Sequence, residues 1–139
     1  MTPVEREVRA KVYELFREGA FEVTPELLAA EGGWERDLVS KALANLEAEH
    51  RLVLRTDGAV WMAHPFSGVE TGYRACIGER VWNSNCAWDA LAILALLGDG
   101  RAEGPRGLVW DVRDGLVRPD GLVHLLVPVS RFWDDIGFT

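Results

Sequence analysis

Residues 83–91 read N-S-N-C-A-W-D-A-L, with a cysteine after three small polar residues and an aspartate three positions later. Asparagine and serine are preferred N-cap residues, so we expect Cys86 in the first turn of a helix. Unpaired N–H groups and the helix dipole there favour an anion, which predicts a lowered thiol pKa. Asp89, on the same face, could take the thiol proton and return it to a leaving group. The alternative is an inert packed cysteine with an aspartate that only complements the dipole.

Other polar residues are weaker candidates for chemistry. Cys76 lies in an alternating pattern that is typical of a strand, so packing is its expected role, although its closeness in sequence to Cys86 keeps it a candidate. His124 alternates with valines and leucines and is interpreted as a structural histidine. Asp134 and Asp135 form either a solvated pair or paired carboxylates for acid–base work or cation binding.

The composition of the chain narrows the classes of protein to which it can belong. The 139 residues are 48% hydrophobic and 27% charged, which is typical of a globular chain, and the net charge of −7 argues against nucleic-acid binding. Two cysteines are too few for a disulfide scaffold and predict free thiols in a reducing compartment. No signal peptide is visible, and the longest apolar run, 90–97, is too short to cross a bilayer. We therefore expect a cytoplasmic protein without a membrane span.

The first half of the chain shows helical periodicity. The pattern predicts helices over 3–18, 25–32 and 35–49, followed by a β-hairpin at Asp57-Gly58. In the third helix the expected inner stripe consists of Leu38, Ala42, Leu43 and Leu46. This order of elements predicts a winged-helix-like domain over residues 1–63. A recognition helix should be net basic, and the third helix is not, so a structural module is favoured over DNA binding.

The sequence pattern in the second half of the chain predicts a small β-sheet around one helix. Residues 64–68 are interpreted as a linker at a domain boundary, and 86–97 as a central buried helix because it is apolar nearly all round. The other expected elements are a strand or hairpin at 73–81, a loop at 98–107, strands at 108–112 and 122–129, and a helical turn at 130–135. The predicted fold is therefore α+β, with a second domain over residues 64–139.

In three stretches the chain resembles the organomercurial (alkylmercury) lyases. The first similar stretch is Y-R-A-C-I-G-E-R-V-W-N-S-N-C-A-W-D-A-L-A-I-L-A-L-L-G, residues 73–98, which matches the family's strand, cysteine, x-x-Asp and apolar helix. The second is the N-terminal half, since the family carries a winged-helix-like domain ahead of its catalytic part. The third is G-L-V-H-L-L-V-P-V-S-R-F-W-D-D-I-G-F-T, residues 121–139. The likeness spans most of the chain.

The resemblance implies cleavage of a carbon–mercury bond. In the family two cysteine thiolates hold the mercury and an aspartate relays a proton to the departing carbon. By position, Cys86 is the first cysteine, which would bind the mercury of substrate or product, and Asp89 is the proton carrier. Trp82 and Trp88 either wall an apolar pocket or pack in the core. The implied partners are an organomercurial or Hg(II) and an external thiol that removes the product, and no separate cofactor is implied. The oligomeric state stays open, with a homodimer as one alternative.

The chain departs from the family pattern at the second cysteine, which is expected at about the residue following Thr139, where the sequence stops. Three explanations stay open. The chain is a truncated product of a longer gene, or it is a naturally short relative that binds without full lyase chemistry, or Cys76 supplies the second thiol. The alternative function is a non-enzymatic protein, either a mercury or soft-metal binder or a winged-helix regulator that senses such a ligand.

Overall fold

The fold is that of a computed structural model, which describes residues 1–121 and 127–137. It begins with three helices, as the periodicity predicts: α1 (Pro3–Glu18), α2 (Pro25–Gly32) and α3 (Arg36–Ala48). Side chains that precede the first two helices cap them: Thr2 accepts from the backbone N–H of Glu5, and Thr24 accepts from that of Leu27. These caps explain why both helices start where the sequence indicates.

The buried stripe of α3 differs from the expected one by a single position. It consists of Val39, Ala42, Leu43 and Leu46, whereas Leu38 is 40% exposed. Positions 39, 42, 43 and 46 follow the i, i+3, i+4, i+7 spacing of one helix face, and position 38 falls outside it. The inclusion of Leu38 in the stripe was therefore wrong.

Eight strands in the described part of the chain form one sheet in the order β1-β2-β3-β5-β4-β6-β7-β8, and neighbouring strands run antiparallel. The strands are β1 (Val53–Leu54), β2 (Val60–Ala63), β3 (Phe66–Ser67), β4 (Tyr73–Ile77), β5 (Arg80–Ser84), β6 (Gly100–Gly104), β7 (Leu108–Arg113) and β8 (Leu116–Arg118). The mixture of helices and antiparallel sheet confirms the predicted α+β class.

Two segments expected to be irregular are strands. The stretch 64–68, interpreted as a linker, contains β3, which pairs with β2 and β5 and joins the first hairpin to the rest of the sheet. The stretch 98–107, interpreted as a loop, contains β6, which lies between β4 and β7. In the strand expected over 122–129, residues 122–126 lie outside the described residues, and Val129 begins a 3-10 helix, η2 (Val129–Asp134).

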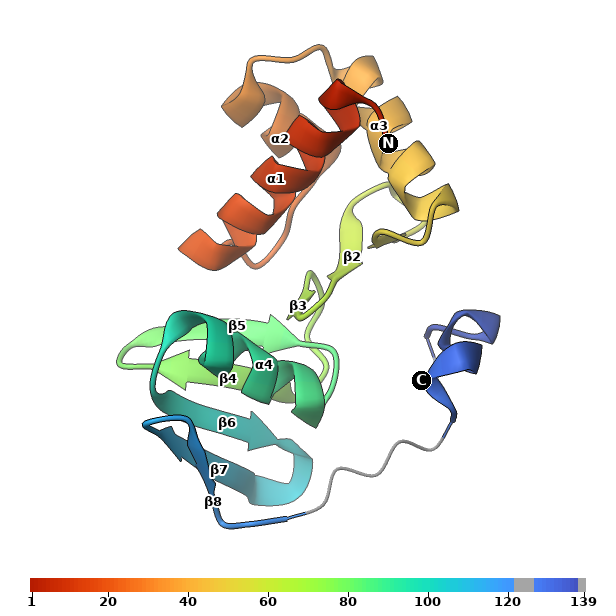
Figure 1. The fold of residues 1–139 in the computed structure, drawn as a ribbon. Helices are drawn as coiled ribbons and strands as arrows, with labels where there is room; N and C mark the ends of the chain where they lie inside the picture. Colours follow the sequence, from red (N-terminus) through yellow and green to blue (C-terminus); the bar gives the residue numbers. More distant parts are fainter. Residues whose placement is uncertain (122–126, 138–139) are drawn as a thin grey trace.

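Helix α4 (Ala87–Leu97) lies across one face of β4, β5 and β6 (Figure 1). Its inward side carries Ala90, Ile93 and Leu94, while Leu96 is exposed. A helix that covers one sheet face has only one side to bury, so α4 is a covering helix rather than the central buried helix that its composition predicted. Two residues connect its N-terminus to the end of β5.

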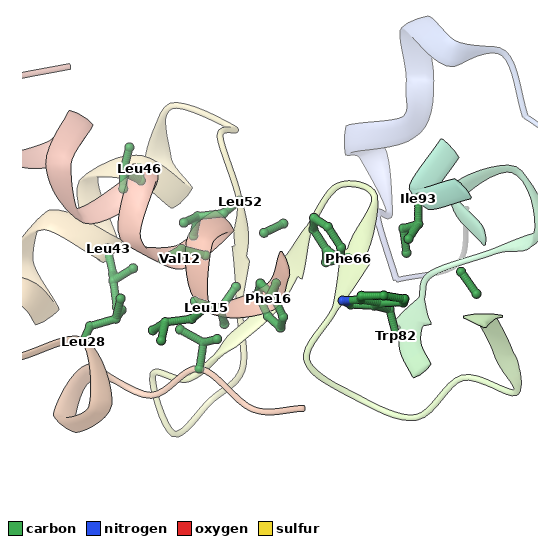
Figure 2. Close-up of a cluster of buried hydrophobic side chains, with 14 of the residues drawn as sticks. Val12, Leu15, Phe16, Leu28, Leu43, Leu46, Leu52, Phe66, Trp82 and Ile93 are labelled. Carbon is green, nitrogen blue, oxygen red and sulfur yellow. The ribbon is translucent and has the colours of Figure 1, made fainter. Parts of the chain in front are cut away.

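In the described part of the chain, one cluster of buried hydrophobic residues connects the helices to the sheet. The cluster runs from α1, α2 and α3 through Phe66 to Trp82 and Ile93 (Figure 2). The ring of Phe66 stacks on that of Phe16 with centroids 5.8 Å apart, and the indole Nε1–H of Trp82 donates to the Arg17 carbonyl at 3.2 Å. The division of the chain into domains at residues 63 and 64 remains a prediction.

The described C-terminal residues return to the helical part of the molecule (Figure 1). Trp133, in η2, stacks on His50 just beyond α3, with ring centroids 4.3 Å apart and planes 8° from parallel. None of the helices in the described residues has the length and apolar character that a bilayer crossing requires.

Candidate functional site

The candidate site lies where β5 gives way to α4. The strand ends at Ser84, Asn85 and Cys86 form the connection, and the helix begins at Ala87. Cys86 is the N-cap residue, with φ −155° and ψ −179°, one position before the first turn in which it was expected. The hydroxyl of Ser84 donates to the Cys86 carbonyl at 3.2 Å and so fixes the backbone at this corner. The thiol is therefore held at the N-terminus of α4.

The pKa of the Cys86 thiol is raised, mainly because burial removes solvent from the charged form. The negative charge of Asp89 raises this pKa further, whereas the backbone N–H groups of Asp89 and Trp88, which hydrogen-bond to the sulfur, lower it. The predicted lowering of the pKa was wrong because desolvation outweighs these N–H groups. At neutral pH Cys86 is consequently a thiol that needs a proton acceptor before it can bind a soft electrophile.

The carboxylate of Asp89, a residue that is only 8% exposed, lies in the first turn of the same helix and has the chemistry of a proton acceptor. Its Oδ2 accepts a hydrogen bond from the Asn85 amide Nδ2 at 2.8 Å. The same oxygen lies 3.2 Å from Nδ1 of His64, and because an ionised carboxylate can only accept, a hydrogen bond between them has Nδ1–H as its donor. Asp89 is thus a buried carboxylate with contacts to Asn85 and His64, and it lies beside a half-buried thiol.

The sequence interpretation missed His64 and treated Asn85 only as a capping residue. His64 lies 25 residues before Asp89, in the stretch interpreted as a linker, so no local spacing connects the two. The link is made by the sheet: β3 pairs with β5 through Phe66 and Ser84, which brings His64 beside Asn85. The histidine before a strand-like P-F-S was the available signal, but it becomes meaningful only with this pairing.

Cys76 lies elsewhere in the fold. Its neighbour in β4, Ala75, is fully buried in the core, so the alternation of a strand directs Cys76 to the opposite face of the sheet from α4. There it lines an open hollow of about 340 Å³ together with the charged residues Arg101 and Glu103. Burial, followed by the charge of Glu103, raises the pKa of its thiol. The structure does not bring Cys76 and Cys86 together.

The two candidate tryptophans differ in environment. Trp82 is buried in the core and carries the Arg80 guanidinium over its ring at 4.8 Å, so packing accounts for it. Trp88 is 59% exposed in the first turn of α4 and forms part of the surface next to Cys86.

The remaining polar candidates are Asp134, Asp135 and His124. Asp134 pairs with Arg131 at 2.8 Å on the surface, and His124 lies outside the described residues. No group of three or more His, Cys, Asp or Glu side chains within residues 1–121 and 127–137 could hold a metal ion.

Among solved structures, the mercury-bound form of MerB2 matches 86% of this chain with a TM-score of 0.65 and 21% sequence identity. The match covers 62% of the MerB2 chain, so this chain spans less than two thirds of that protein's length. At this identity the match establishes a shared fold. No protein-family model and no curated protein matches the sequence.

Proposed function

We propose that this protein is an organomercurial lyase-like enzyme that cleaves a carbon–mercury bond by protonolysis. The observation that carries the proposal is the half-buried Cys86 thiol next to the buried Asp89 carboxylate at the N-terminus of α4. The shared fold with mercury-bound MerB2 and the resemblance to organomercurial lyases support it. Mercury is a soft ion that prefers thiolate sulfur, which gives Cys86 its role.

The proposed reaction uses one thiol and one carboxylate, and the proton that leaves the thiol ends on the carbon. The mercury of R–Hg⁺ binds the Cys86 sulfur as the thiol proton passes to Asp89. The proton then moves from Asp89 to the carbon, which keeps the electron pair of the carbon–mercury bond and departs as the hydrocarbon RH. Asp89 is again a carboxylate, and Hg(II) stays on Cys86 until an external thiol binds the metal and returns a proton to the cysteine.

A specific observation favours a second candidate function, a non-enzymatic mercury or soft-metal binder. Within the described residues Cys86 has no second thiol beside it, since Cys76 occupies the other face of the sheet. A second thiolate would add electron density to the metal and weaken the carbon–mercury bond. With one thiolate the protein would bind the organomercurial and leave that bond intact.

The deciding experiment measures hydrocarbon release from methylmercury and phenylmercury by the purified chain, with a small thiol in excess. The lyase proposal expects release by the wild type, at least a hundredfold less with Cys86→Ser or Asp89→Asn, and little change with the matched control Cys76→Ser. Tight binding without release, lost only in Cys86→Ser, would support the binder. Equal binding by wild type and Cys86→Ser would refute both proposals.

A further inference from the structure

Two donors converge on one oxygen of the Asp89 carboxylate. The Asn85 amide reaches Oδ2 at 2.8 Å, and Nδ1 of His64 lies 3.2 Å from the same atom. In the described part of the chain, both side-chain contacts with the Asp89 carboxylate are therefore made to the same atom, Oδ2. Donors on one oxygen localise negative charge there, which leaves Oδ1 as the oxygen available to take up a proton.

The Asn85 side chain is oriented so that its amide N–H group contacts Asp89. Its Nδ2 faces Asp89 Oδ2 and the Phe66 carbonyl, 3.3 Å away, while its own Oδ1 is buried without a hydrogen-bond partner. A buried acceptor left unsatisfied is unfavourable, so the contacts of Nδ2 must hold this orientation. The opposite orientation would place the amide oxygen against the carboxylate oxygen, and the two would repel.

His64 supplies the second contact from the other side of the carboxylate. Its side chain is 45% exposed, so it stands at the rim of the site, whereas Asp89 lies beneath it. The register of β3 against β5 sets its position relative to Asn85. The titratable groups that the structure places around this contact are Asp89 itself and, next to Asp89, the thiol of Cys86.

We propose that His64 and Asn85 are positioning residues that fix the Asp89 carboxylate so that Oδ1 receives the thiol proton and delivers it to carbon. This inference rests on the proposed lyase function. Neither residue touches the reacting atoms; each acts through Asp89. A loss of either contact should therefore slow the cleavage step and leave binding of the organomercurial to Cys86 unchanged.

The test compares two substitutions of nearly equal size at His64. His64→Asn places an amide N–H close to the position of Nδ1 and keeps a donor, whereas His64→Leu removes it. In single-turnover hydrocarbon release, His64→Leu should be slower by about tenfold to a hundredfold, and His64→Asn should stay within about threefold of the wild type. The dissociation constant for phenylmercury should change by less than about twofold in both.

Asn85 gives an independent comparison. Asn85→Leu should slow the cleavage step to a similar extent, and the His64→Leu/Asn85→Leu double variant should be less impaired than the product of the two single effects, because both side chains act on one oxygen. Equal rates for His64→Leu and wild type would overturn the inference. So would equal defects in His64→Asn and His64→Leu, or a loss of rate that merely follows weaker binding.

A measurement independent of turnover separates this inference from the proposed function. Nitrogen-15 NMR of the neutral imidazoles identifies the His64 signal by its loss in His64→Asn. The wild type should show the Nδ1–H tautomer, and Asp89→Ala should return His64 to the usual Nε2–H form. An Nε2–H tautomer in the wild type would overturn the positioning contact. Absence of cleavage by a protein with the Nδ1–H tautomer would refute the lyase function alone.

Discussion

At the scale of single residues, the site places a half-buried thiol, Cys86, beside a buried carboxylate, Asp89. Burial favours the neutral thiol of Cys86, and the charge of Asp89 nearby favours it further. A soft metal changes this balance, because a sulfur that binds mercury must release its proton. In the absence of metal, the negative charge of the Asp89 carboxylate favours the protonated thiol. When the sulfur binds mercury, the same carboxylate is the group best placed to accept the released proton.

The raised pKa of Cys86 predicts slow alkylation at neutral pH. The thiolate is the nucleophile, and a thiol whose pKa lies above its ordinary value has little thiolate at pH 7. Reaction of the Cys76→Ser variant with iodoacetamide should therefore rise about tenfold per pH unit from pH 7 and continue to rise beyond the ordinary thiol range. Mass spectrometry of the modified chain follows the rate.

The control for this prediction is Cys86→Ser, which leaves Cys76 as the reacting thiol. Its pKa is also raised by burial, so it should show a similar dependence on pH. A rate for Cys86 that levels off below pH 8 would contradict the prediction and would indicate the lowered pKa expected from sequence.

Part of this site could be predicted from sequence and part could not. N-S-N-C-A-W-D indicates a capped helix start, so Cys86 and Asp89 are readable as a pair from local spacing. The contact of His64 with Asp89 depends on the pairing of β3 with β5, and the direction of the Cys86 pKa depends on burial. Neither pairing nor burial is encoded in a short window of residues.

At the scale of elements, the short strand β3 joins the helices to the sheet. Its Phe66 stacks on Phe16 of α1 and meets the Tyr13 ring edge-on at 6.4 Å. Substitution of Phe66 by alanine should lower the free energy of unfolding by about 3–5 kcal/mol, because it removes a buried ring and leaves a cavity. Urea denaturation monitored by circular dichroism measures this loss.

Phe21→Ala provides the matched control for Phe66→Ala. Phe21 is 60% exposed, so its removal should change the free energy of unfolding by no more than about 0.5 kcal/mol. Equal effects of the two substitutions would show that Phe66 does not connect the two parts of the molecule.

Glycine at position 100 allows α4 to pack closely on β6. A Cβ there would lie 2.9 Å from Leu94 Cδ2 and 2.9 Å from Ile77 Cγ1, and it would also press on the Cys76 carbonyl. Gly100→Ala should therefore lower the free energy of unfolding by about 1–3 kcal/mol through overpacking. Gly121→Ala, where nothing lies within 4 Å, is the control and should be close to neutral. A neutral Gly100→Ala would mean that Leu94, Ile77 and the backbone of β4 can all shift without cost.

A helix or strand could be predicted from sequence where the residues that determine it lie within the element or next to it. Helices α1 and α2 carry their own caps and stops, so their bounds were predictable. Strands β3 and β6 have two and five residues, and the glycines at both ends of β6 resemble a loop. Their strand conformation comes from partners distant in sequence, which a local pattern does not contain.

At the scale of the whole molecule, the shared core predicts one cooperative unfolding transition. Residues from the helices and from the sheet belong to the same buried cluster, so neither part buries its apolar surface alone. Urea transitions followed by far-UV circular dichroism, which reports mainly the helices, and by tryptophan fluorescence should coincide. Two separated transitions would instead support independent domains over residues 1–63 and 64–139.

The stacking of Trp133 on His50 also has a consequence for the order of folding. The two rings are far apart in sequence, so their contact closes a loop that contains the whole sheet and α4. Such a closure costs more chain entropy than a hairpin does, and it becomes favourable only after the intervening elements have folded. We expect the contact to form last during folding and to open first in the native state, as a local fluctuation that leaves the thiol and carboxylate of the site undisturbed.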